Sequence, residues 1–286
     1  MQTLSDIKRL LDDRGLAPKK SLGQNFLIDH NLIKRLVDAS GAQADDIILE
    51  VGPGTGTLTE ELLARGCRVV ACELDDHLSA MLRERAAAGE VAGANGRENL
   101  TVIHADCLGP DRTLAPVVLD ALRGAGSDPR GFRLVANLPY SAATPLMTSL
   151  LLGHPDCPIL AVTIQKEVAD RLLAAPRTKE YGGLSVVAQA LCTVQRLATL
   201  PRECFWPRPD VTSAMILLTR RQSPLSADPL ALSAFCRTIF AQRRKQLGSA
   251  LGRAAPWPAD IRPEQRAEEL SVEQIERLRL ALIPIS

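Results

Sequence analysis

Short apolar, β-branched runs alternate with helix-like segments through the first two thirds of the chain. Helical patterns separate most of these runs, for example at residues 58–64, 77–88, 145–152 and 166–174. The runs predict strands at residues 47–51, 68–73, 100–104, 132–136, 159–164, 193–199 and 213–219. Strands that alternate with helices are typical of a parallel sheet with helices on both faces. The pattern therefore predicts an α/β fold, and the last two strands are free to form a hairpin at the sheet edge.

The pattern changes after Arg221. Residues 222–229 are typical of a linker, and the segments beyond it are helix-like, at residues 230–241, 243–251, 263–270 and 272–282. Ser271 suits the N-cap of the last segment, and Pro263 suits a first helical turn. We predict two domains, residues 1–221 and a small all-α domain of residues 222–286. Residues 86–98 and 109–131 are predicted to be surface excursions.

Composition is that of an ordinary globular protein, with 46% hydrophobic and 23% charged residues. No apolar run reaches the roughly 20 residues of a membrane helix, and no secretory apolar core follows the N-terminus, so we expect a cytoplasmic protein without membrane contact. The seven cysteines form no Cys-x-x-Cys pair, which favours reduced thiols. The four histidines are isolated, so no metal is expected.

The net charge of +1 hides a local excess of basic residues. Between Arg196 and Arg253 there are ten Arg and Lys residues against three Asp and Glu residues. Such an excess is typical of a surface that binds phosphate groups. Considered alone, the region fits a solvated basic helix equally well.

A glycine-rich loop at residues 50–56 directly follows the first predicted strand and opens a helix. Its three glycines permit a tight turn and a close approach of backbone to ligand. They are Gly52, Gly54 and Gly56. Glu73 ends the second strand, where an acid can bond ribose hydroxyls, and Asp106 follows the third, where a carboxylate can accept from an adenine amino group. A dinucleotide-binding oxidoreductase is the alternative, but the Gly-x-Gly-x-Gly spacing favours S-adenosylmethionine.

The run Asn137-Leu138-Pro139-Tyr140 ends the fourth predicted strand. The exocyclic amine of adenine is a poor nucleophile, because its lone pair is delocalised into the ring. The side-chain oxygen of Asn137 and the backbone carbonyl of Leu138 can accept hydrogen bonds from this amine and aim its lone pair at a methyl donor. Pro139 restricts Leu138 to an extended backbone, and Tyr140 offers a ring for an extruded base. In isolation the run also fits a simple turn; after this strand it predicts an adenine N6-methyltransferase.

A second aromatic run begins at Phe205, between the last two predicted strands. We predict that Phe205 closes an aromatic sandwich around the target adenine, opposite Tyr140. The alternative is a proline-fixed loop with one core aromatic.

Together these motifs resemble those of the ribosomal RNA adenine dimethyltransferase family, in its bacterial branch that acts on small-subunit (16S) RNA. The resemblance covers nearly the whole chain. Residues 19–27 are similar to a segment that covers the cofactor, which implies that Asn25 and Leu27 contact the methyl donor. Residues 50–56, Glu73, Asp106 and Asn137 match the remaining cofactor motifs in order. Residues 240–245 resemble the family's basic helix, which implies RNA contacts by Arg243, Arg244 and Lys245.

The resemblance implies a Rossmann-like, seven-stranded S-adenosylmethionine-dependent methyltransferase sheet, followed by a helical RNA- and ribosome-binding domain. The implied reaction is dimethylation of N6 of two adjacent adenines in the 3′-terminal hairpin of 16S rRNA. The implied substrate is a late precursor of the small ribosomal subunit, and the enzyme is expected to be a monomer. The two excursions and the bulky Trp206 depart from the family pattern.

Three alternatives stay open. One is the related macrolide-resistance branch, which methylates large-subunit RNA with the same core. A DNA adenine methyltransferase is less favoured, since no extended target-recognition domain is evident. The third is an assembly checkpoint that binds immature subunits, with methylation secondary.

Overall fold

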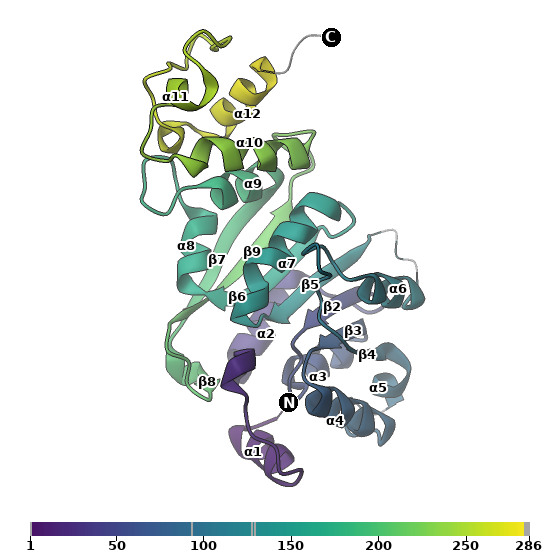
Figure 1. Cartoon of the computed structure of the whole chain (residues 1–286). Coiled ribbons are helices and arrows are strands. Elements are labelled where there is room, and N and C mark those ends of the chain that lie inside the picture. The colour runs from purple at the N-terminus through teal and green to yellow at the C-terminus, as the bar shows by residue number, and fades with distance from the viewer. Residues whose placement is uncertain (1, 93, 127, 129, 283–286) are drawn as a thin grey trace. The chain divides into compact units, whose positions relative to one another are not determined.

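The computed structural model describes residues 2–92, 94–126, 128 and 130–282 (Figure 1). Its α-helices are α1 (Leu4–Asp12), α2 (His30–Ser40), α3 (Thr57–Ala64), α4 (Asp76–Ala87), α5 (Ala94–Asn99), α6 (Pro116–Gly124), α7 (Tyr140–Gly153), α8 (Lys166–Leu173), α9 (Gly183–Leu191), α10 (Pro229–Ala241), α11 (Leu247–Leu251) and α12 (Val272–Ala281). Its strands are β1 (Phe26–Leu27), β2 (Ile47–Val51), β3 (Arg68–Glu73), β4 (Leu100–His104), β5 (Phe132–Asn137), β6 (Ile159–Gln165), β7 (Cys192–Leu200), β8 (Phe205–Trp206) and β9 (Ser213–Arg220). Short 3₁₀ turns lie at Lys20–Leu22, Arg202–Cys204 and Ala267–Glu269.

A seven-stranded sheet runs in the order β4-β3-β2-β5-β6-β9-β7. The first five strands in this order pair in parallel, with Ile48 of β2 beside Val69 of β3 and Arg133 of β5. The predicted Rossmann-like α/β fold is therefore confirmed. β7 and β9 are neighbours at one edge, as the missing helix between them suggested. A small antiparallel pair, β1 with β8, was not predicted, because two residues are too short a run to show a period.

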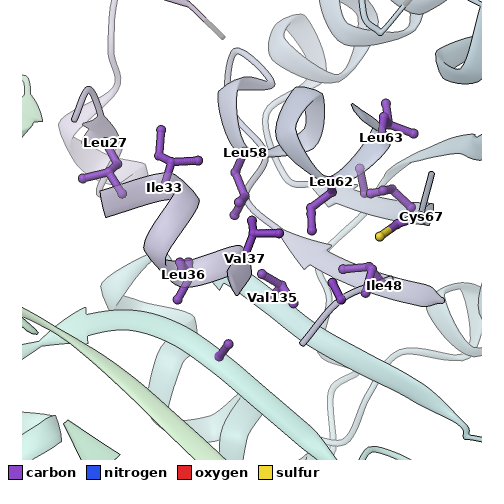
Figure 2. Close-up of a cluster of buried hydrophobic side chains, with 14 of the residues drawn as sticks. Leu27, Ile33, Leu36, Val37, Ile48, Leu58, Leu62, Leu63, Cys67 and Val135 are labelled. Atoms are coloured by element: carbon purple, nitrogen blue, oxygen red, sulfur yellow. The ribbon is translucent and has the colours of Figure 1, made fainter. Parts of the chain in front are cut away.

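The core on one face of the sheet is formed by helices α2 and α3 (Figure 2). Ile33, Leu36 and Val37 of α2 are at most 1% exposed. They share a buried cluster with Ile48 of β2 and Val135 of β5. This packing holds β2 and β5 in place, and with them the polar residues at their carboxyl ends.

The chain forms two compact units, residues 1–166 with 196–217, and residues 167–195 with 218–286. In the second unit α10 packs on α9 and α12. Tyr181, 1% exposed, donates from its hydroxyl to the carbonyl of Leu270 at 3.0 Å and meets the ring of Phe240 edge-on. The sequence places a functional boundary at residue 222, and that division of roles between 1–221 and 222–286 stays a prediction.

Two predicted C-terminal helices are wrong in extent. Residues 242–245 form a turn, so the basic run is not helical and α11 begins only at Leu247. Residues 263–270 hold one short 3₁₀ turn instead of a helix that begins at Pro263. There the carbonyls of Pro263 and Gln265 accept from Gly248 and Leu247, at 2.8 Å each. These tertiary bonds replace the helical ones. Ser271 does cap α12, as predicted.

The two predicted excursions contain helices, α5 and α6. α6 packs on β3 and β4 and buries Val118 and Leu122. The glycines and prolines that flank it hid this apolar face in the sequence pattern.

Candidate active site

The carboxyl ends of β2, β3, β4 and β5 converge on one cavity, as expected for an open α/β sheet. Its volume is about 490 Å³, within the range of roughly 300–1,000 Å³ of small-molecule sites. Most of the predicted site residues of the sheet domain line it, namely Asn25, Leu27, Gly52, Gly54, Glu73, Asp106, Asn137, Leu138, Pro139, Tyr140 and Phe205. The topology therefore gathers residues from six separate regions of the sequence.

Gly52 and Gly54 have backbone φ angles of +72° and +59°, in the left-handed region that favours glycine. A Cβ at Gly54 would lie 2.7 Å from the ring of Phe26, so no larger residue fits there. Bare backbone thus forms this wall of the cavity. Gly56 lies outside the cavity wall, and Leu82 packs against it.

Glu73 is 6% exposed at the end of β3. One carboxylate oxygen accepts the backbone N–H of Gly54 at 3.1 Å, and the other accepts that of Asp75 at 2.9 Å. Burial raises the pKa of Glu73. Each oxygen makes one of these bonds and retains a further lone pair for a ribose hydroxyl. The site therefore fits a nucleoside cofactor in its hydrogen-bond acceptors as well as in its volume.

Asp106 is exposed just past β4, and one of its oxygens accepts the backbone N–H of Leu108 at 2.9 Å. Arg112, in the left-handed region at φ +63°, brings the one guanidinium of the described cavity lining. It belongs to the stretch that the sequence marks as an excursion. That stretch is therefore part of the site wall.

Glu50 is buried beneath the glycine loop, with 1% exposure. Its carboxyl accepts the hydroxyl of Thr59 at 2.7 Å. Burial raises the pKa of Glu50 to about 8, and the nearby Glu73 adds to the shift. At neutral pH this raised pKa favours the protonated carboxyl.

Asn137 ends β5 beside Thr163 of β6. Its side-chain nitrogen donates to the backbone carbonyl of Asn25 at 3.0 Å. The next residue, Leu138, donates its backbone N–H to the carbonyl of Thr163 at 3.1 Å. The amide nitrogen of Asn137 is thereby committed to Asn25, and its oxygen remains as the acceptor.

Tyr140 begins α7, directly after Pro139, which stands at the N-cap with φ −55° and ψ 132°. The Tyr140 hydroxyl and the buried Ser213 hydroxyl are 2.8 Å apart. Burial raises the pKa of Tyr140. The phenol is thus neutral. Its ring is held at one end by the backbone of α7 and at the other by the contact of its hydroxyl with Ser213.

Phe205 lines the same cavity as Tyr140 but is only 4% exposed and packs in the core cluster with Leu27. Its place in a sandwich around a base stays a prediction. The neighbouring Trp206 stacks on Phe26, with ring centroids 6.2 Å apart, and the Lys8 ammonium lies 5.5 Å from its ring. This packing against the N-terminal segment explains the bulky residue.

The three predicted RNA-binding residues, in the second unit, differ in their surroundings. Arg243 bonds Glu268 at 2.5 Å, the carbonyl of Thr178 at 2.9 Å and the carbonyl of Lys179. Arg244 and Lys245 are exposed. Arg243 therefore holds its own unit together, whereas the other two present their charges to solvent.

Asp75 and Gln24 were not predicted from the sequence to belong to the site. The Asp75 carboxylate caps α4 and also accepts from Lys19 and Gln24. An Asp just before a helical pattern is an N-cap signal, which was available in the sequence. The contact between Gln24 and Asp75 joins positions 51 residues apart and carries no local signal.

All seven cysteines are free thiols, as predicted. Among the residues that the structure describes, there is no group of three or more His, Cys, Asp or Glu side chains placed to hold a metal ion. None of the helices in the described part of the chain is long and apolar enough to cross a membrane.

The chain is also similar in sequence to a family of known proteins. The model of the family described as ribosomal RNA adenine dimethylase matches residues 15–282. The ribosomal RNA small subunit methyltransferase A of Geobacillus thermodenitrificans is 37% identical over 293 residues, which cover 97% of this chain and 95% of the relative. The protein of the same name from Streptomyces avermitilis is 37% identical over 285 residues, covering 96% and 91%.

Two solved structures share the fold. A dimethyladenosine transferase from Plasmodium falciparum aligns with a TM-score of 0.70 at 22% identity, covering 88% of this chain and 95% of the other. The 23S rRNA methyltransferase ErmE aligns with a TM-score of 0.61 at 26% identity, covering 90% and 99%. With the family match over nearly the whole sequence, the chain belongs to the ribosomal RNA adenine dimethylase family and is an S-adenosylmethionine-dependent rRNA adenine dimethyltransferase.

Proposed function

We propose that this enzyme dimethylates N6 of two adjacent adenines in the 3′-terminal hairpin of 16S rRNA. Its substrate would be a late precursor of the small ribosomal subunit in the cytoplasm, and it would act as a monomer without a metal. The observation that carries the reaction is the bond from the Asn137 amide nitrogen to Asn25, which leaves the amide oxygen as an acceptor in a nucleoside-sized cavity. The names of the relatives support the small subunit as the target.

The cofactor would be held by the wall formed from β2, β3 and β4. Glu73 would bond the ribose hydroxyls and Asp106 the adenine amine, while Gly52 and Gly54 would let the backbone approach the ligand. Asn25 and Leu27 would cover it from the N-terminal side, and Gly56 would support the turn. When bound, S-adenosylmethionine supplies an electrophilic methyl group.

The chemistry asked of the protein is orientation of a weak nucleophile. In the first transfer, Asn137 Oδ1 and the carbonyl of Leu138 would accept both amine hydrogens and turn the nitrogen lone pair toward the methyl donor. In the second transfer, one of these oxygens would accept the single hydrogen that remains. Pro139 fixes the direction of that carbonyl, and the rings of Tyr140 and Phe205 would hold the extruded base. The proton released on transfer would leave to solvent, so no strong base is required.

RNA affinity would come from basic residues outside the cavity. Arg244 and Lys245 are exposed and suited to phosphate, whereas the bonds of Arg243 support the turn that carries them. We assign the catalytic role to residues 1–221 and the ribosome-binding role to residues 222–286. Because phosphate contacts carry little sequence information, the choice of adenines would rest on RNA shape and on subunit contacts.

The test uses small subunits from a strain that lacks the methyltransferase. Wild-type enzyme with labelled cofactor is expected to yield two adjacent dimethyladenosines near the 3′ end, seen by mass spectrometry of RNase fragments. Asn137→Ala is expected to lose transfer while cofactor and subunit binding stay measurable. Transfer only to large subunits, or normal turnover by Asn137→Ala, would overturn the proposal.

A further inference from the structure

We propose that Asp75 and Gln24 are positioning residues for methyl transfer, because they fasten the segment of residues 19–25 so that its last carbonyl orients the Asn137 amide. This inference rests on the proposed role of Asn137. The segment lies along the cavity wall, between the end of β3 and the end of β5. We call residues 19–25 the strap.

Asp75 is the first anchor of the strap. It is 3% exposed, and its two oxygens have separate tasks. Oδ1 caps helix α4 by accepting the backbone N–H groups of His77 and Leu78, at 3.0 and 3.3 Å. Oδ2 accepts from Gln24 Nε2 and from Lys19 Nζ, at 2.9 Å each. The strap can therefore be released without removal of the helix cap.

Gln24 closes the strap on itself. Its side-chain oxygen accepts the backbone N–H of Lys19 at 2.8 Å, while its nitrogen reaches Asp75. One amide thus ties the start of the strap to its end and ties both to the sheet domain. Asn25 follows directly in the chain.

The second anchor lies just beyond Asn25. Phe26 and Leu27 pair with Trp206 and Phe205 in the small antiparallel ladder. Phe26 also packs against the backbone of Gly54. The carbonyl of Asn25 is therefore held between two fixed points, one on each side in the chain.

The direction of the Asn137 amide matters to the chemistry. The terminal torsion of Asn is broad and roughly two-fold, so the amide can present either its oxygen or its nitrogen to the cavity. A nitrogen would place a donor against the donor hydrogens of the target amine. The bond to the Asn25 carbonyl selects the productive direction, since only the nitrogen can donate to it. Glu73 joins the same network through the N–H of Asp75.

The first test is Gln24→Met, which keeps the side-chain length but loses both amide bonds. In single-turnover assays on small subunits at saturating cofactor, we expect the rate to fall about 10- to 100-fold, with a smaller change in the cofactor Kd and a cooperative melting transition that shows the variant to be folded. Lys20→Met, an exposed side chain in the same strap, is the matched control and should keep the wild-type rate. An unchanged rate in Gln24→Met would overturn the inference.

A double-mutant cycle separates positioning from a merely structural effect. In an Asn137→Ser background there is no amide to orient, so Gln24→Met should add little further loss. If the rate loss of the double variant equals the product of the losses of the two single variants, Gln24 acts independently of Asn137, and the inference is overturned. Asp75→Ser, which keeps a helix-capping oxygen but is too short for the strap, should repeat the behaviour of Gln24→Met. If Asn137→Ala is inactive while both strap variants are fully active, the proposed function survives and the positioning role is wrong.

Discussion

The Cα of Gly52 faces the ring of Pro139 so closely that an added Cβ would lie 2.9 Å from its Cγ. The glycine-rich loop after β2 and the turn after β5 therefore pack directly on each other. Because Pro139 sets where the carbonyl of Leu138 points, the cofactor wall and the amine-binding turn share one geometry. The close contact is a property of the folded site and not of either motif alone.

Gly52→Ala is expected to lose most of its activity. The change adds left-handed strain at φ +72° and pushes Pro139 out of place, so both the cofactor wall and the Leu138 carbonyl move. We expect a fall in kcat of at least about 10-fold, since displacements of about 1 Å at a reacting centre cost up to about 100-fold. Steady-state assays on small subunits measure it.

The matched control is Gly15→Ala. Gly15 has a similar φ of +64°, but nothing lies within 4 Å of its added Cβ. This variant is expected to lose only about 1 kcal/mol of stability with kcat unchanged. Equal kcat values in the two variants would show that the contact with Pro139 has no catalytic consequence.

Tyr140→Phe is expected to keep most of the activity, with less than about a 10-fold loss in kcat/KM. The change removes one hydrogen bond to Ser213 but retains the ring that the base is proposed to stack on. Tyr140→Ala removes the ring and should lose about 1–3 kcal/mol of base binding, roughly 5- to 150-fold. Ser213→Ala is the control for the lost hydrogen bond. If Tyr140→Phe lost as much kcat/KM as Tyr140→Ala, the hydroxyl and not the ring would be the important group of Tyr140.

Much of the sheet and its polar edge was predictable because each signal is local. The strands β2, β3 and β4 were predicted with their observed bounds, since buried apolar runs between turn residues leave few alternatives. Glu73 and Asn137 could be placed at one edge because parallel strands must end together.

Other parts depended on long-range contacts that no window of sequence contains. α7 begins five residues before the predicted start, because Pro145 lies inside the helix while Leu146 and Leu150 hold it against the core. The strap is fixed by Gln24 and Asp75 across 51 residues. The turn at residues 242–245 carries a run of basic residues. Such a run also suits a helix, so the charge pattern alone could not distinguish a turn from a helix.

Arg243 should differ from its two basic neighbours. Arg243→Ala removes the ion pair with Glu268 and the guanidinium bonds to the carbonyls of Thr178 and Lys179, so we expect the unfolding free energy to fall by about 1–3 kcal/mol. Arg244→Ala and Lys245→Ala should leave stability within about 0.5 kcal/mol. Urea denaturation of the three variants measures this.

The same two exposed residues should govern RNA affinity. Arg244→Ala and Lys245→Ala are each expected to weaken subunit binding and to reduce the salt dependence of binding by about one counterion. Binding titrations at three salt concentrations give that slope. Unchanged affinity and slope in the double variant would mean that this turn lies away from the RNA.

Glu50 should make the unliganded enzyme less stable as pH rises. Its pKa is about 8 in the folded chain, mainly because of burial, and 4.5 is its ordinary value. A raised carboxyl pKa contributes stability that is complete below pH 4.5 and is lost as pH rises toward 8, because the unfolded chain then releases a proton that the folded chain keeps. The loss from one such proton is at most about 1.4 kcal/mol per pH unit. Glu50→Gln, which can still accept from Thr59, should remove this slope in urea denaturation between pH 5 and 8. The exposed Glu264→Gln should retain it, and a wild-type slope in Glu50→Gln would mean that Glu50 is ionised in the folded chain.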